Sequence, residues 1–226
     1  MYETWTAPQA DGATSREMAL VIAGKGPLRL LVLPPLFDEA NKLRRQLHAV
    51  MRRLSTRGIA SVLPDLPGCN ESTASLAKQT LNSWRAASAA AATHFAASHV
   101  LAVRSAANLA PEGLPGWLYA PHSASKLLRS LARAQSLAEG ETGKERQPTR
   151  IIEAARAQGA TIAGWPLGAE MITQLESAKE PAASDLLALV DHDAIGGPPL
   201  WLRAEASEDA AQAEALASLI ATGMTA

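Results

Sequence analysis

The chain has 226 residues and a formal net charge of −1, which is long enough for a continuous hydrophobic core and gives no electrostatic basis for binding nucleic acid or a membrane surface. The single cysteine, Cys69, excludes an intramolecular disulfide and a multi-cysteine metal site. No apolar run approaches the roughly 20 residues that span a bilayer. We therefore expect a soluble, cytoplasmic protein without membrane insertion. The sequence leaves its oligomeric state open.

Short apolar runs alternate with longer helical patterns along the chain. Strands are expected at residues 28–33, 59–63, 99–103, 116–120, 160–164 and 199–204, with 18–23 and 28–33 joined as a hairpin through 24–27. Helices are expected near 43–54, 76–97, from Ser123 onward as N-cap, and at 149–158, 169–178 and 207–221, with a mobile polar loop at 140–148. This alternation predicts an α/β fold with three layers, a mostly parallel sheet with helices on both faces, formed by one domain over 1–226.

Residues 99–107 run from an expected strand into a helix start and resemble the nucleophile elbow of the α/β-hydrolases. The G-x-S-x-G elbow uses glycines because its nucleophile sits in a strained turn, where neighbouring side chains collide. Here Ala102 and Ala106 occupy the glycine positions, and Arg104 stands at the nucleophile position. Only a short stretch separates Ser105 from Pro111, so the elbow helix is expected to be a stub. The pattern predicts a hydrolase-like body with a degenerate elbow.

Four further segments carry the same resemblance over most of the chain from about Leu30. Residues 33–42 are similar to the oxyanion-loop string P-P-F-x-E-E-x-N-K of the exosortase-A-system-associated hydrolases, and 64–72 resemble the D-L-P-G-x-G-x-S loop of α/β-hydrolases. Residues 117–133 are similar to a W-x-P segment with its leucine- and arginine-containing helix, and 163–167 to a G-[YF]-x-L signature. The resemblance implies a link to bacterial exopolysaccharide production and names no substrate.

The general base of a serine hydrolase is missing at its expected place. The triad needs a histidine after the last strand, in the chain order Ser, acid, His. The expected last strand at 199–204 is followed by Glu205–Asp209, and no histidine occurs after His192. A serine hydroxyl without an imidazole in reach is a weak nucleophile.

Each candidate residue near the elbow has two interpretations. Ser105 is a shifted nucleophile or a helix N-cap, and the missing partner favours the cap. His122 is a displaced base or a hydrogen-bonded structural residue. The Arg104 guanidinium either binds a carboxylate or phosphate or forms a salt bridge to Asp38, Glu39 or Asp65.

The remaining motifs point to loops. The string 191–193, Asp-His-Asp, suits a solvated turn better than a metal site, because consecutive side chains diverge. The segment 140–145 lacks P-loop spacing. Asp65 either lines the cleft or orders its own turn. No metal or cofactor is expected. Ligands of open α/β sheets bind beyond the carboxyl ends of the strands. We therefore expect several residues that fall there to share one pocket: Pro35, Leu36, Phe37, Asp65, Arg104, Ser105 and His122.

Three classes of function follow. The preferred one is a non-catalytic α/β-hydrolase-fold protein that binds a small anionic ligand or a protein partner through Arg104, Pro35, Leu36, Phe37 and Asp65. The second is a serine esterase or thioesterase using Ser105 with a displaced base such as His122. The third is an interaction subunit of a polysaccharide-export system, which would need an exposed apolar patch.

Overall fold

The main sheet of the computed structural model, which describes residues 1–141, 143 and 146–225, has seven strands in the order β1-β2-β4-β3-β5-β6-β9. The strands are β1 (Tyr2–Pro8), β2 (Thr14–Ile22), β3 (Arg29–Leu33), β4 (Ala60–Pro64), β5 (His99–Val103), β6 (Gly116–Tyr119) and β9 (Leu187–Val190). β1 and β2 pair antiparallel with each other, and β2 pairs antiparallel with β4; all pairs from β4 to β9 are parallel. The expected mostly parallel sheet is confirmed.

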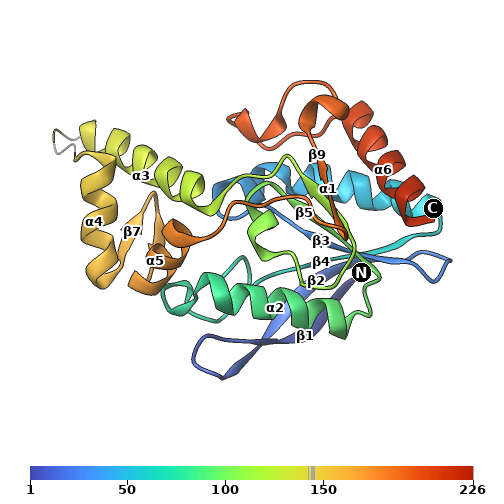
Figure 1. The fold of residues 1–226 in the computed structure, drawn as a ribbon, viewed down its shortest axis with the longest axis horizontal. Helices are drawn as coiled ribbons and strands as arrows, with labels where there is room; N and C mark the ends of the chain where they lie inside the picture. The colour runs from blue at the N-terminus through green and yellow to red at the C-terminus, as the bar shows by residue number, and fades with distance from the viewer. Residues whose placement is uncertain (142, 144–145, 226) are drawn as a thin grey trace.

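Helices cover both faces of this sheet (Figure 1). On one face α1 (Asp38–Thr56) and α6 (Ala210–Thr225) lie side by side, and leucines of α1 such as Leu43 and Leu47 pack with β3 and β5 residues. On the other face α2 (Leu81–His94) packs against β1 and buries Trp84 and two alanines, Ala87 and Ala91. Small side chains let this helix approach the sheet closely, which suits a chain with few aromatic residues.

A segment that we call the cap, residues 124–177, is inserted between β6 and β9. It contains α3 (Ala124–Gly140), α4 (Pro148–Gln158), a hairpin of β7 (Ala160–Ile162) and β8 (Trp165–Leu167), and α5 (Ala169–Ser177). The Ser123 hydroxyl accepts the Lys126 backbone N–H and caps α3, as expected. Figure 1 shows the outer ends of α3 and α4 extending away from the sheet.

Three sequence-based expectations about strands are wrong. Residues 18–23 and 28–33 do not form a hairpin, because β2 pairs with β1 and β4 while β3 lies between β4 and β5. Residues 160–164 belong to the cap hairpin and not to the main sheet. The segment expected as the last strand contains instead the 3₁₀ helix η4 (Leu200–Leu202), since Pro198 and Pro199 carry no N–H to offer a strand ladder.

Other differences are smaller. Residues 76–97 contain two helices, the 3₁₀ helix η1 (Leu76–Lys78) and α2. Thr80 lies between them and begins α2 by forming a capping box with Ser83. The loop expected to be mobile, at 140–148, includes residues 142, 144 and 145, which lie outside the described part of the chain. No helix within the described ranges is long and apolar enough to cross a membrane.

Candidate functional site

The turn after β5 has a strained backbone at Arg104, as expected from its resemblance to the G-x-S-x-G elbow. Arg104 has a φ of +55°, in the left-handed region that ordinary side chains rarely adopt, and begins the short 3₁₀ helix η2 (Arg104–Leu109). The expected stub is therefore present. Ala102 and Ala106 are both fully buried beside it. Their methyl groups do not prevent the strained turn, contrary to the argument from the missing glycines.

The Arg104 side chain is held from three sides. Its Nε donates to Glu39 Oε2 and its Nη2 to Glu39 Oε1, both at 3.1 Å, and its Nη1 donates to the Ala120 carbonyl at 3.0 Å. The guanidinium also lies over the Trp201 ring, 4.3 Å from its centroid. The side chains of Arg104 and Glu39 are only 12% and 19% exposed. Of the two interpretations, the salt bridge is the one found, and it leaves no free guanidinium to hold an anionic ligand.

Ser105 is fully buried, and its hydroxyl accepts the backbone N–H of Leu36 at 2.9 Å. Its side chain does not cap η2, because the helix begins one residue earlier and has no side-chain cap. The expectation of an N-cap is therefore wrong. The bond to Leu36 ties the loop after β3 to the turn after β5.

His122 lies on the segment after β6, and its backbone N–H donates to the Arg104 carbonyl at 3.1 Å. Its imidazole is half-buried, and among the described residues it has no hydrogen-bond partner. Burial, and then the nearby Arg104 charge, lower the pKa of His122, so the neutral ring is favoured near pH 7. No hydrogen bond joins it to Ser105 within the described part of the chain, so these two residues do not form a nucleophile–base pair.

A histidine does follow the last strand of the sheet, which corrects the sequence argument. The last strand is β9, and Asp191 and His192 come directly after it. His192 Nδ1 meets the Tyr119 hydroxyl at 2.7 Å, and its Nε2 meets the Gly197 carbonyl at 3.0 Å. Both ring nitrogens are therefore used structurally. The apolar run Leu186–Val190 was the signal that could have revealed β9.

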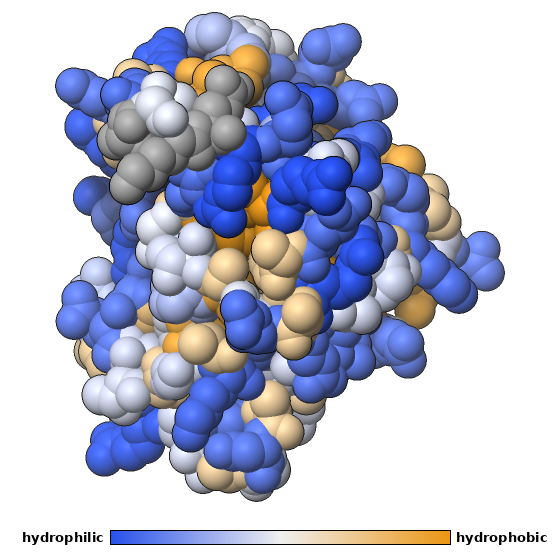
Figure 2. Space-filling view, turned by 90° about the vertical axis from the view of Figure 1, so that its left-hand side faces the viewer, coloured by the Kyte–Doolittle hydropathy of each residue, from blue (hydrophilic) through white to orange (hydrophobic). Residues whose placement is uncertain are grey.

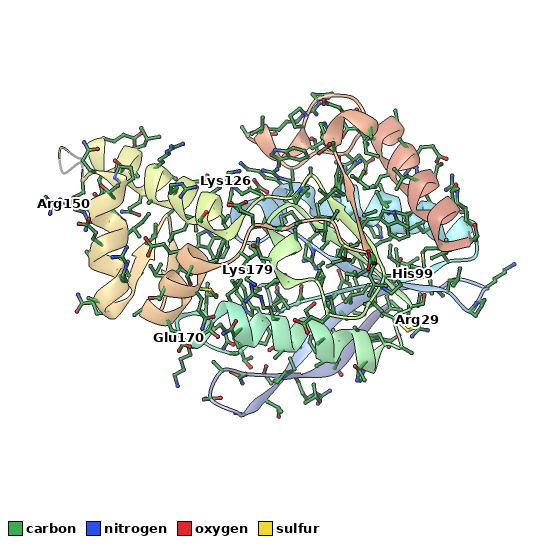
Figure 3. The ribbon with its side chains drawn as sticks, in the orientation of Figure 1. Arg29, His99, Lys126, Arg150, Glu170 and Lys179 are labelled. Carbon is green, nitrogen blue, oxygen red and sulfur yellow. The ribbon has the colours of Figure 1, made fainter. Side chains whose placement is uncertain are left out.

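A cavity of about 540 Å³ lies between the cap and the carboxyl ends of the strands. From the strand side it is lined by Leu36, Phe37, Asp38, Glu39, Lys42, His122 and Trp201, and from the cap by Leu127, Ser130, Leu131, Ala134, Ala163, Gly164 and Trp165. Figure 2, which views the molecule from the cap side, shows hydrophobic residues at the bottom of a hollow bordered by hydrophilic ones. Arg29 and His99, at the starts of β3 and β5, lie at the opposite end of the strands (Figure 3).

The charged groups around this cavity are paired. Lys42 Nζ lies 2.8 Å from Asp38 Oδ2, one turn apart on α1, and Glu39 is bound by Arg104. The Ser130 hydroxyl donates to the Lys126 carbonyl within α3. Since each cation has its own carboxylate, the wall formed by α1 is electrically balanced. A volume of this size with a largely apolar lining is typical of small-molecule sites.

A second, small cavity of about 40 Å³ is lined partly by Pro35, Asp65 and Cys69 and shares Leu36, Phe37 and Trp165 with the large one. The Asp65 carboxylate accepts the Asn70 side-chain amide and lies 3.5 Å from an Arg44 nitrogen, so it both orders its loop and lines this cavity. Burial raises the pKa of the Cys69 thiol to about 12. The thiol is therefore protonated, as expected for a cysteine that is not a nucleophile.

The expected pocket residues thus gather in one region but not in one cavity. Leu36, Phe37 and His122 line the large cavity, and Pro35 and Asp65 line the small one. Arg104 lies behind two lining residues, Glu39 and Trp201, and Ser105 is buried beneath Leu36. Within residues 1–141, 143 and 146–225, no histidine, cysteine or carboxylate group of three gathers as a metal site.

No known protein-family model and no curated protein matches this chain. Solved structures do match it over nearly its whole length. A putative hydrolase from Agrobacterium vitis S4 is 18% identical, with a TM-score of 0.50, and the match covers 97% of this chain and 99% of that one. Alpha/beta hydrolase domain-containing protein 10 from mouse is 13% identical, with a TM-score of 0.57, and the match covers 99% of this chain and 98% of that one.

A third structure, the bottromycin epimerase BotH in complex with bottromycin A2, is 13% identical and has a TM-score of 0.53, covering 96% of this chain and 99% of that one. Identities this low show a shared architecture only. Together with the strand order and the helices on both faces, they establish that this chain has the α/β-hydrolase fold.

Proposed function

We propose that this chain is a non-hydrolytic protein of α/β-hydrolase fold that binds a ligand in the cavity between the cap and the sheet. The observation that carries the proposal is Arg104, which takes the nucleophile position and is locked there by Glu39 and Ala120. A guanidinium has no lone pair for acyl transfer and stays protonated in proteins. The elbow is therefore degenerate in chemistry while it keeps the strained turn.

The bond between Ser105 and Leu36 supports the same conclusion. In α/β-hydrolases the oxyanion is held by the N–H of the residue after the nucleophile and by an N–H of the loop after the third strand. Leu36 belongs to that loop, and its N–H is already donated to the Ser105 hydroxyl at 2.9 Å. A substrate oxyanion would have to displace a buried internal hydrogen bond. The serine thus occupies one of the donors that it would need for catalysis.

A test with activated acyl esters separates this proposal from the esterase alternative. We expect no appreciable turnover of p-nitrophenyl acetate or butyrate, and no change in any trace rate in Ser105→Ala. Positioning and oxyanion contacts alone can leave about 10³–10⁴-fold over water in a triad enzyme stripped of its side chains, so a modest background is expected at most. Robust turnover that is abolished by Ser105→Ala and by His122→Ala would establish the serine esterase or thioesterase instead.

Non-hydrolytic use of this architecture has a counterpart among the solved structures, since one of them is an epimerase in complex with bottromycin A2. Ligand binding without acyl transfer is therefore compatible with the fold. The anionic ligand expected from the sequence loses its main support, because the Arg104 charge is neutralised by Glu39. Binding of a protein partner stays open as part of the proposal.

A link to bacterial exopolysaccharide production, with this chain as a ligand-binding or interaction subunit, is proposed from the sequence resemblance alone. Several large apolar side chains are exposed, as an interaction surface would require. Leu137 lies on α3 of the cap, Leu186 directly precedes β9, Leu189 lies on β9, and Leu202 lies on η4. We expect deletion of the gene to reduce exopolysaccharide yield. Expression of the Ser105→Ala variant in the deletion strain should restore the yield fully. An unchanged yield in the deletion strain would remove this link.

A further inference from the structure

The cavity between the cap and the sheet differs from a typical ion-binding site, because its charges are already used. Asp38 is paired with Lys42, and Glu39 with Arg104. A charged ligand group would have to displace an existing partner or be buried without one. An unpaired ion in an apolar surrounding is costly, so such a ligand gains little. The cavity therefore offers a charged ligand no unpaired counter-ion among its lining side chains in the described ranges.

His122 and the two lining tryptophans, Trp165 and Trp201, differ from the other polar side chains of the cavity, because no hydrogen bond within the described residues engages their ring nitrogens. The carboxylates and the ammonium group form ion pairs, and the Ser130 hydroxyl bonds within α3. The His122 imidazole, in contrast, has no hydrogen-bond partner in the part of the chain that the structure describes. A neutral imidazole offers one donor and one acceptor. It is thus the unpartnered lining group that can both donate to a ligand and accept from it, whereas the indole N–H groups of Trp165 and Trp201 can only donate.

The charged groups that act on His122 come from several elements, and their signs are mixed. Arg104 and Lys126 oppose protonation, while Glu39 and Glu180 favour it, and burial is the largest influence. Lys126, at the start of α3, and Lys179, near Glu180, both lie on the cap side of the sheet in Figure 3. The neutral ring is consistent with a ligand that carries no charge of its own.

The rest of the lining is apolar and aromatic. Phe37 packs against Trp165 with ring centroids 5.4 Å apart, and Trp165 and Trp201 are both half-buried at the cavity. Leu127 and Leu131 of α3 complete an apolar wall opposite the ion pairs of α1. We infer that the ligand of this cavity is an uncharged, mainly apolar molecule that places one hydrogen-bonding group, a hydroxyl or a carbonyl, against the His122 imidazole. This inference rests on the proposed binding function.

Three probes with one chain length and different head groups test the inference: decan-1-ol, decanoate and decylammonium, titrated at pH 7.5 by calorimetry. We expect decan-1-ol to bind at least tenfold more tightly than either ion. We expect His122→Leu to weaken decan-1-ol binding about fivefold, the loss of one hydrogen bond worth about 1 kcal/mol, and His122→Gln to retain most of it. His48→Leu is the matched control, because His48 is half-buried on α1 outside the cavity lining.

The outcomes distinguish the inference from the function on which it rests. Tighter binding of decanoate or decylammonium than of decan-1-ol would overturn the ligand class and leave ligand binding standing. Decan-1-ol binding that is equal in His122→Leu and His48→Leu would remove the role of His122. Failure of all three probes to bind, while all variants unfold cooperatively, would overturn the inference and count against the binding function. The absence of hydrolysis would still be tested separately by ester turnover.

Discussion

Glu39, in the first turn of α1, and Arg104, in the strained turn after β5, are joined by two contacts of 3.1 Å each. This ion pair links the loop after β3 to the loop after β5, the two loops that build a hydrolase active site. Because both side chains are mostly buried, the pair fixes the turn after β5 against the first turn of α1.

Removing one partner of this ion pair should lower the free energy of unfolding more than removing both partners. We expect Glu39→Gln to lower the free energy of unfolding by about 1–3 kcal/mol, because it leaves the buried Arg104 charge without its carboxylate. The double variant Glu39→Gln with Arg104→Met should recover part of that loss. Urea denaturation of the wild type, both single variants and the double variant gives the coupling energy directly.

Asp38→Asn is the control for this cycle, since Asp38 is a neighbouring acid in the same turn and its side chain is 65% exposed. An exposed ion pair contributes about 0–1 kcal/mol, so this substitution should change stability little. If Glu39→Gln were as mild as Asp38→Asn, the pair would not be a structural lock.

The sequence was sufficient to find the turn after β5 and to notice Arg104 in it, because strand, turn and helix start are local signals. The fate of the Arg104 charge was not local: Glu39 is 65 positions away, and three acids were equal candidates. For the same reason the local sequence pattern predicts a helix cap for the Ser105 hydroxyl. Its actual partner, Leu36, depends on how two loops meet in space.

The strands that were misplaced share a physical cause. Short apolar runs do not reveal which neighbour they pair with, so 18–23 was joined to 28–33 although β2 lies between β1 and β4. Leu200–Leu202 and Leu187–Val190 are both short apolar runs, and the two prolines that precede the first distinguish it from the second, which forms a strand. In β1, Trp5 and Ala7 alternate with exposed residues, a period-2 pattern that is typical of a strand with one buried face.

Glu17 of β2 provides a prediction about pH. Its side chain is buried; Oε1 accepts hydrogen bonds from Ser15 and Ser72, and Oε2 has no partner within the described residues. Burial is the main cause of a raised pKa of Glu17, which nearby Asp65 raises further. A raised folded-state pKa means that stability is fully present below the unfolded pKa and is lost as pH rises through the folded one. We therefore expect Glu17→Gln to gain stability relative to the wild type as pH rises from 4 to 8.

Unfolding midpoints in urea at pH 4, 6 and 8 measure this difference. Glu3→Gln is the matched control, because Glu3 is exposed on the adjacent strand β1. The stability of Glu3→Gln relative to the wild type should stay nearly constant with pH. If the stability of Glu17→Gln relative to the wild type fell between pH 4 and pH 8, the ionised carboxylate would be stabilising in the folded state and the prediction would be wrong.

Placing a serine at position 104 should not create an esterase. In Arg104→Ser the hydroxyl would stand at the nucleophile position, but Leu36 would still donate its N–H to Ser105, and the unpartnered His122 imidazole has no acid to orient it. We expect no ester turnover above that of the wild type. Adding Ser105→Gly frees the Leu36 donor, and one such donor is worth about 10²–10³-fold in a working acyl-transfer site. Any rate that emerges should therefore require both changes, as measured with p-nitrophenyl acetate. High turnover of Arg104→Ser alone would mean that base and oxyanion donors are already in place and that only the nucleophile has been lost.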